Sequence, residues 1–418
     1  TILFLFTAVV LLITPVFILI FAPGFYFDDY KREISVDVLR IMFPYLALIS
    51  LVAFAGGIQN THNRFSLPAF TPLIFNACLI FAALIIAPKY DIPIYVLAWG
   101  VLTAGFVQLV IQLFPLKQID RLPIPKFDLN NQGTRKVFKL IIPAILAGGI
   151  MQINLLIDTI FASLLQTGSP TWLYVSDRLI QFPMGIFAIA IGTVLLPTLS
   201  KIDVSKDMNG FINIVKKGQR FVLFIGIPSF IGLALCSTDI LSTIFLRGEF
   251  KAYDVNQASL SLIAFSFGLP FFMLMKVLTP AFFARKDTKT PMYIALLSLF
   301  LNAFLNYILA FVLNYGHVGI AIGSSISAFV SVIILELILV QQGIVNLYNP
   351  FNRFNFSILV PSLVVIAFLF FLSEHISFLQ LSMINKILVL SLKVFISIGI
   401  YLSLSRLIYG KPLKEIFN

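Results

Sequence analysis

The sequence predicts an all-α protein that crosses a membrane many times. Of its 418 residues, 59% are hydrophobic and 11% are charged, and the mean hydropathy is +1.00. Soluble domains contain about 25% charged residues, so this chain has too little polar surface for a soluble fold of its size. A membrane β-barrel would show short alternating segments of about ten residues, and the sequence shows none. These observations exclude a soluble enzyme, a disordered chain and a disulfide-rich secreted domain.

Twelve apolar runs are long enough to form transmembrane helices, since a helix needs about 20 residues to cross the hydrocarbon core. In chain order, the predicted spans are 1–22, 38–58, 69–88, 93–117, 138–164, 171–197, 220–245, 258–283, 292–314, 317–341, 357–375 and 386–408.

The basic residues of the loops predict the orientation of these spans. Nineteen Lys and Arg residues follow the even-numbered spans or lie in the tail, and six follow the odd-numbered spans. Lys and Arg concentrate in cytoplasmic loops, so we expect both ends of the chain in the cytoplasm. The net charge of +11 is therefore a membrane-orientation signal and does not indicate nucleic-acid binding.

A weak internal repeat predicts two related lobes. The pairs Pro44/Pro270, Pro68/Pro291 and Asn76/Asn302 are separated by 223 to 226 positions, which is typical of a parallel repeat. The two spans within 138–197 have no partner, so we expect two further helices before residue 1. The predicted plan is two six-helix lobes, the first lacking two helices, plus two appended helices. Its predicted parts are an incomplete lobe at 1–117, a basic cytoplasmic linker at 118–137, a second lobe at 138–342, and the appended helices with the tail at 343–418.

Charged residues inside spans are costly and mark candidate sites. Asp177 and Arg178 are adjacent in the segment SDRLIQFPMG, and Lys276 lies midway along the span at 258–283. The first two form either an interfacial ion pair or an anion-recognition group, because arginine binds phosphate with two hydrogen bonds. Lys276 is too deep to reach the surface, which favours a role in a polar cavity.

A carboxylate and two amides form a second candidate site. Asn302 and Asn306 are four residues apart and therefore share a helix face, and Asp158 lies in the span at 138–164. These oxygens suit a hard cation such as sodium, or form hydrogen bonds between helices. Asp239 is interpreted as marking a span end, and Lys393 as structural.

Three segments resemble the MurJ/MviN family of lipid II flippases. GGIQNTHNRFSLPAFTPLIFNACLI at 56–80 resembles the signature that follows the family's fourth helix. SDRLIQFPMGIFAIAIGTVLLPTLS at 176–200 resembles its eighth-helix signature, and RKDTKTP at 285–291 resembles a basic turn between two later helices. The resemblance extends over essentially the whole chain.

The resemblance implies a multi-pass, monomeric bacterial inner-membrane protein that moves lipid II outward by alternating access. It implies a cationic cavity between the lobes for the pyrophosphate and a groove along the last two helices for the lipid tail. The substrate-binding positions that it indicates are Arg178, Asp177, Lys276, Arg64 and Gln181, where Gln181 replaces a Glu of some members. The positions for a sodium ion are Asp158, Asn302, Asn306 and Val318, where Asn306 replaces an acidic residue.

Other functions stay open at this point. A transporter could carry another polyprenyl-linked glycan, or export drugs in exchange for cations. A non-transporting scaffold of the wall-synthesis machinery is an alternative of another class. The sequence contains no nucleophile–base pair, phosphate loop or ATPase motif, so we expect a transporter and no enzyme.

Overall fold

The computed structural model describes residues 2–118, 152–202, 207–344, 353–376 and 378–410. The chain divides into two compact units, Thr1–Ala147 and Gly148–Asn418. Within the described ranges the residues form helices and turns, with one isolated β-bridge between Arg247 and Phe250. The prediction of an all-α fold is therefore confirmed. The predicted basic linker at 118–137 lies almost wholly outside the described residues.

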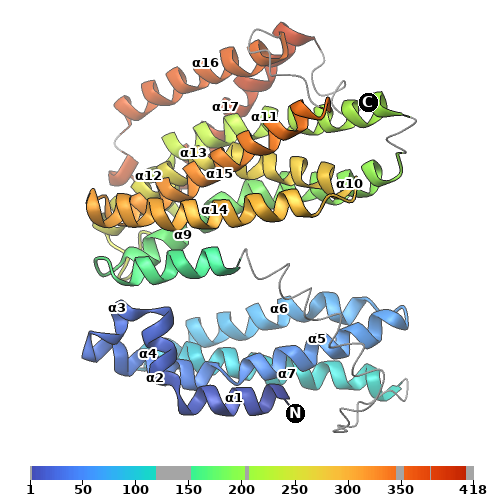
Figure 1. Ribbon diagram of the computed structural model, residues 1–418. Coiled ribbons are helices and arrows are strands. Elements are labelled where there is room, and N and C mark those ends of the chain that lie inside the picture. Colours follow the sequence, from blue (N-terminus) through green and yellow to red (C-terminus); the bar gives the residue numbers. More distant parts are fainter. Residues whose placement is uncertain (1, 119–151, 203–206, 345–352, 377, 411–418) are drawn as a thin grey trace. The chain divides into compact units, whose positions relative to one another are not determined.

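The first unit is built from a series of short and long helices (Figure 1). In order they are α1 (Ile2–Leu12), α2 (Thr14–Phe21), α3 (Pro23–Tyr26), α4 (Asp29–Met42), α5 (Tyr45–Thr61), α6 (Ser66–Phe81), η1 (Ala82–Ile86), η2 (Ala87–Lys89) and α7 (Pro93–Gln118). Helix α7 packs against α4, α5 and α6 and so forms the centre of this unit.

The second unit contains the larger hydrophobic core. A helix over residues 152–163 precedes its named elements. These are α9 (Ser169–Pro183), η3 (Met184–Ala188), α10 (Ile189–Ser200), α11 (Met208–Leu235), α12 (Ser237–Ile244), α13 (Ala252–Phe283), α14 (Lys289–Tyr307), η4 (Ile308–Val312), α15 (Gly316–Gln341), α16 (Arg353–His375), η5 (Phe378–Gln380) and α17 (Met383–Tyr409).

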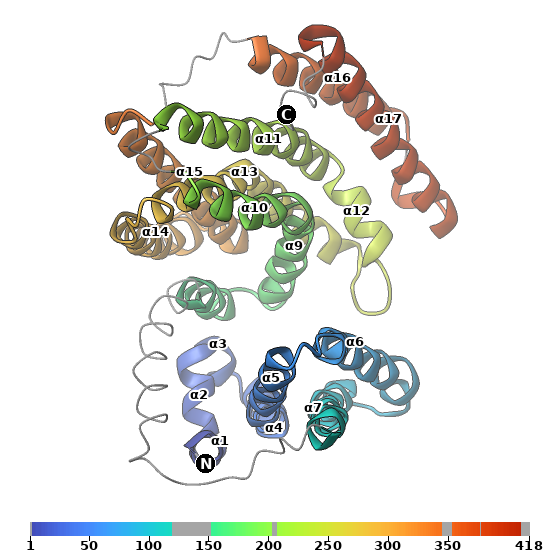
Figure 2. The same cartoon turned by 90° about the vertical axis from the view of Figure 1, so that its right-hand side faces the viewer.

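Helices α13 and α15 are the centre of the second unit. Of the most apolar 18-residue segment of each helix, 67% is buried in α13 and 61% in α15, compared with 11% in α17. Helices α16 and α17 lie side by side at the edge of the unit, next to α11 and α12 (Figure 2). The appended helices therefore form a separate layer on a well-packed core.

Ten helices in the described ranges are long and apolar enough to cross a membrane, and a bent pair raises this number to eleven. The predicted span at 138–164 lies partly outside the described residues. Together these observations are in line with the twelve predicted spans and make the chain a multi-pass membrane protein.

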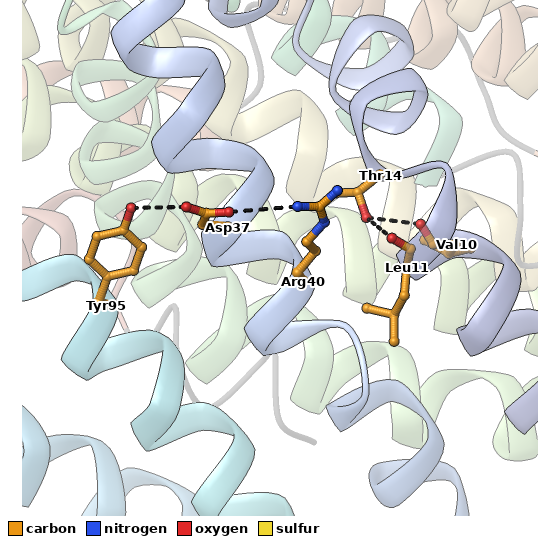
Figure 3. A network of polar contacts seen from close by, with 6 residues as sticks. All are labelled: Val10, Leu11, Thr14, Asp37, Arg40 and Tyr95. Atoms are coloured by element: carbon orange, nitrogen blue, oxygen red, sulfur yellow. Dashed lines mark hydrogen bonds and ion pairs between the residues drawn. The ribbon is translucent and has the colours of Figure 1, made fainter.

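The first predicted span, 1–22, is not one straight helix. It consists of α1 and α2, which meet at an angle of 84°. Pro15 lies at the start of α2, where its ring has no N–H to donate and excludes a straight continuation. The Thr14 hydroxyl bonds the carbonyl oxygens of Val10 and Leu11 at 2.9 and 3.0 Å, so the carbonyls near the break are satisfied (Figure 3).

The two units share irregular features at the spacing of the predicted repeat. Helix α5 ends in a turn where the N–H groups of His62 and Arg64 both donate to Gln59 O. The N–H groups of Arg285 and Asp287 both donate to Phe282 O at the end of α13, 223 positions later. The π-helical segments η1 and η4 also correspond, with a spacing of 226.

Candidate functional site

The buried side of α9 is fixed by polar anchors in the second unit. Trp172, which is 1% exposed, donates from Nε1 to Asp254 Oδ1 at 2.9 Å. One turn later, the Ser176 hydroxyl is 2.8 Å from the Ala258 carbonyl oxygen. Ile180 continues this buried face at the same i, i+4 spacing. The neighbouring polar residues of α9 must therefore point away from the core.

The exposed side of α9 holds Asp177, Arg178 and Gln181 together. Gln181 Nε2 donates to Asp177 Oδ2, and Arg178 Nη1 lies 3.5 Å from Gln181 Oε1. The Arg178 guanidinium also stacks on Tyr174, 4.8 Å from the ring centre. These contacts hold the guanidinium in place while its exposed side stays available. The arrangement can bind an anion such as a phosphate.

Lys276 is half-buried on α13, and in the described part of the chain its ammonium has no hydrogen bond or ion pair. The backbone of Lys276 lies close to α10, since a Cβ built on Gly192 would be 3.4 Å from Lys276 O. Among the described residues, Lys276 and Arg178 form no direct contact, as two cations would not, so a shared anionic ligand would be needed to join them.

Asp158 and three other side chains form a hydrogen-bonded ring. Asn306 Nδ2 donates to Asp158 Oδ1 at 2.6 Å and lies 3.1 Å from Asn302 Oδ1. Asn302 Nδ2 donates to Ser324 Oγ at 3.0 Å, and that hydroxyl donates to Asp158 Oδ2 at 3.4 Å. The ring joins the helix at 152–163 to α14 and α15.

The oxygen atoms of this ring fit a hard cation. Asn302 and Asn306 are fully buried, and Asn306 Oδ1 has no hydrogen-bond partner. An orphaned carbonyl oxygen beside a carboxylate, an amide and a hydroxyl is a donor set that suits Na⁺ better than a transition metal. Among the residues that the structure describes, His, Cys, Asp and Glu form no group of three that would hold a metal. Val318 lies six residues before Ser324 and adds no side chain to the ring.

Arg64 lies in the first unit, beside a cavity of about 480 Å³. Its Nη1 donates to Gln118 Oε1 at 2.9 Å and so links the end of α5 to the end of α7. Gln59, which also lines the cavity, is fully buried and bonds to Gln112. Arg64 is therefore part of a polar end of the first unit, in a different unit from Arg178.

Sequence reasoning missed the polar contacts of α4. Tyr95 donates to Asp37 Oδ2 at 3.4 Å, and Arg40 Nη1 is 3.9 Å from Asp37 Oδ1 (Figure 3). In Figure 3 the Arg40 guanidinium lies between Asp37 and Thr14, and Thr14 lies at the break between α1 and α2. The sequence feature that could have indicated this pair is the i, i+3 spacing of Asp37 and Arg40 at the start of a predicted span.

The fold defines a polytopic α-helical membrane protein. The family model "Lipid II flippase MurJ" matches residues 1–388. The chain belongs to this family, and it is a multi-pass inner-membrane protein. A probable lipid II flippase MurJ of Vibrio cholerae is 42% identical over 317 residues, which are 76% of this chain and 60% of that protein. The chain thus matches less than two thirds of this relative's length.

Solved structures agree with this family. A lipid II flippase MurJ in an inward closed conformation matches with a TM-score of 0.79 and 25% identity, over 98% of this chain and 81% of that one. An inward-facing multidrug MATE family transporter matches with a TM-score of 0.63 and 12% identity, over 81% of this chain and 79% of that one. The second match shows a shared fold alone.

Proposed function

We propose that the chain moves lipid II from the cytoplasmic to the periplasmic leaflet by alternating access, as a monomer and without covalent chemistry. Membership of the MurJ family carries this proposal. The exposed Arg178 on α9 supports it, because a lipid-linked pyrophosphate needs a fixed cation for recognition.

In this proposal Arg178 and Lys276 of the second unit hold the pyrophosphate, and Asp177 and Gln181 orient the Arg178 guanidinium. Arg64 is proposed separately as a substrate-binding cation of the first unit. Helices α16 and α17 hold the prenyl tail, since α17 exposes a long apolar surface. Both ends of the chain lie in the cytoplasm, as the loop charges predict.

A sodium ion is proposed at the ring around Asp158. The carboxylate of Asp158, Oδ1 of Asn306, Oδ1 of Asn302 and Oγ of Ser324 would hold it. When bound, the ion supplies a positive charge that neutralises the buried carboxylate. The side chains of the ring then position three helices relative to one another, which provides a route from an ion gradient to a conformational change.

Binding of lipid II tests the proposal. The purified chain in lipid nanodiscs is given lipid II together with an O-antigen carrier lipid, and native mass spectrometry counts the adducts. We expect selective lipid II adducts that fall at least tenfold in Arg178→Ala. Arg247→Ala is the matched control, because Arg247 is an exposed arginine of the same unit outside the site.

The alternatives give different results. A flippase for another polyprenyl-linked glycan binds the O-antigen carrier as well or better, and a cation-coupled drug exporter binds neither lipid selectively. A non-transporting scaffold tolerates Arg178→Ala in a growth-complementation assay, whereas a flippase loses complementation. Equal adducts in Arg178→Ala and the control contradict the proposed site.

A further inference from the structure

A buried ion pair joins α12 to α17. Lys393 Nζ lies 2.6 Å from Asp239 Oδ2, and the two side chains are 2% and 12% exposed. The Phe378 ring centre lies 5.4 Å from the same ammonium. Lys393 is about 15 Å along α17 from Met383, at 1.5 Å per residue, which is about half of a 30 Å hydrocarbon core. Asp239, which the sequence places near a span end, thus also forms an ion pair inside the second unit.

Much of the surface of α17 is not packed against the rest of the protein. Its most apolar segment is 11% buried, and Leu388, Leu392 and Phe395 are all exposed. Lipid tails are as apolar as leucine, so there is no hydrophobic driving force between helices in a membrane, and van der Waals packing and polar contacts take its place. The polar contacts of α17 are therefore candidates for setting its register and rotation.

Polar contacts of the described residues join α17 to the rest of the second unit. Besides the ion pair, Tyr401 Oη donates to Phe224 O at 2.8 Å, and Ser405 Oγ donates to Ser357 O of α16 at 2.6 Å. Of these contacts, the ion pair is the one made by two charged groups. A displacement of α17 that separates it leaves an uncompensated charge in the hydrocarbon region, which strongly disfavours that displacement.

Lys386 provides an internal comparison. It lies seven residues before Lys393 on the same face of α17 and is 6% exposed. In the described ranges it makes no ion pair. A lysine can therefore be buried on this face of α17 without being joined to α12. Lys393 differs because its ion pair with Asp239 joins α17 to α12.

We propose that Asp239 and Lys393 are positioning residues that hold α17, and α16 packed on it, in one register on the second unit. Their part in transport rests on the proposed function, because it is α16 and α17 that hold the prenyl tail there. Neither residue contacts substrate in this proposal. They set the position of α17, and that position sets the width and depth of the groove that holds the prenyl tail.

Spin-label distances test this proposal without substrate. Nitroxides are placed at Leu388 on α17 and Leu260 on α13, two exposed positions, in the full chain with both native cysteines changed to alanine. The distance distribution is measured in nanodiscs by double electron–electron resonance. We expect one narrow distance in the parent chain and in the control Lys386→Met.

Four variants separate positioning from ordinary packing. Lys393→Met and Asp239→Asn should broaden the distribution, and the charge-swapped Asp239→Lys/Lys393→Asp chain should restore one distance. The apolar double variant Asp239→Leu/Lys393→Met leaves no buried charge, so it should fold with an unchanged or higher melting temperature and still show the broad distribution.

Each outcome decides the assignment. A narrow, parent-like distance in the apolar double variant overturns it, because packing alone then places α17. A narrow distance in Lys393→Met, or a broad one in the charge-swapped chain, also overturns it. If lipid II binding fails while the distances behave as expected, the proposed function is wrong and the positioning role stands.

Discussion

Asn63 and Lys286 occupy the same backbone position in two turns that are 223 residues apart. Their φ angles are +58° and +63°, and each follows a helix whose last carbonyls accept the same pattern of hydrogen bonds. Left-handed backbone at this position closes many helices, usually with glycine or asparagine. Asn63 suits the position, whereas Lys286 is strained there.

Lys286→Gly should therefore stabilise the second unit. Glycine adopts positive φ without the steric cost of a Cβ atom, so the variant should be about 1 kcal/mol more stable than Lys286→Ala, which removes the charge but keeps the strain. Thermal unfolding in detergent measures the difference. Asn63→Gly should change the melting temperature less, and an equal gain at both positions would contradict the argument.

Gly319→Ala should destabilise the contact between α15 and η4. A Cβ atom there would lie 2.6 Å from Leu309 C and 2.7 Å from Ala310 N, and backbone atoms cannot rotate away. We expect a loss of about 1–3 kcal/mol. Gly399→Ala on α17 is the control, because no atom lies within 4 Å of its new Cβ. The control should be neutral or slightly stabilising.

Sodium should stabilise the chain through Asp158. At about 100 times its dissociation constant, a ligand that binds only the folded state adds about 2.7 kcal/mol. The melting temperature should rise in NaCl and not in choline chloride at the same ionic strength. Asp158→Asn should remove this difference. Ser242→Ala, a buried serine outside the ring, should keep it.

Gln181→Glu should weaken anion binding on α9. The Gln181 amide donates to Asp177 and accepts from Arg178. A carboxylate in its place would lie beside the Asp177 carboxylate and compete with an anionic ligand for Arg178. We expect about tenfold weaker binding of lipid II, which corresponds to about 1.4 kcal/mol. Gln166→Glu, at an exposed position before α9, is the control. Stronger binding in Gln181→Glu would show that the family's acidic residue has a role that this chain lacks.

Thr290→Val should make stability depend less on pH. Thr290 donates its hydroxyl and N–H to the Asp287 carboxylate at 2.7 and 3.0 Å, which lowers the pKa of Asp287 below its ordinary value of 3.8. The parent chain gains this stability above pH 3.8 and loses it as the pH falls through the lowered pKa.

The variant should therefore be less stable than the parent at pH 7, and the difference should shrink as the pH falls below 3.8 and through the lowered pKa of Asp287. Melting curves across that range measure this. The neighbouring Thr288 makes no side-chain cap, so Thr288→Val should track the parent. A pH-independent loss in Thr290→Val would assign the effect to packing.

The sequence was sufficient to predict that the chain is a multi-pass membrane protein and to predict some of the residues of the candidate sites. Asn302 and Asn306 share a face because of their spacing, and the structure joins Asn306 to Asp158 directly and Asn302 to Asp158 through Asn306. Ser324 could not be selected, because α15 carries several serines and only packing distinguishes them. Asp239 and Lys393 are 154 positions apart, and no periodic pattern relates two residues at that separation. The break at Pro15 was also missed, because prolines inside transmembrane helices are often tolerated without breaking the span.

The π-helical segments η1 and η4 change which residues face outward at the ends of two helices. The segment η1 continues α6 and η4 continues α14, at the 226-position spacing of the repeat. A π-helical turn holds one residue more than an α-helical turn, and one residue corresponds to about 100° of rotation around a helix of 3.6 residues per turn. The residues after each segment therefore point about 100° away from the direction that an uninterrupted α-helix would give them.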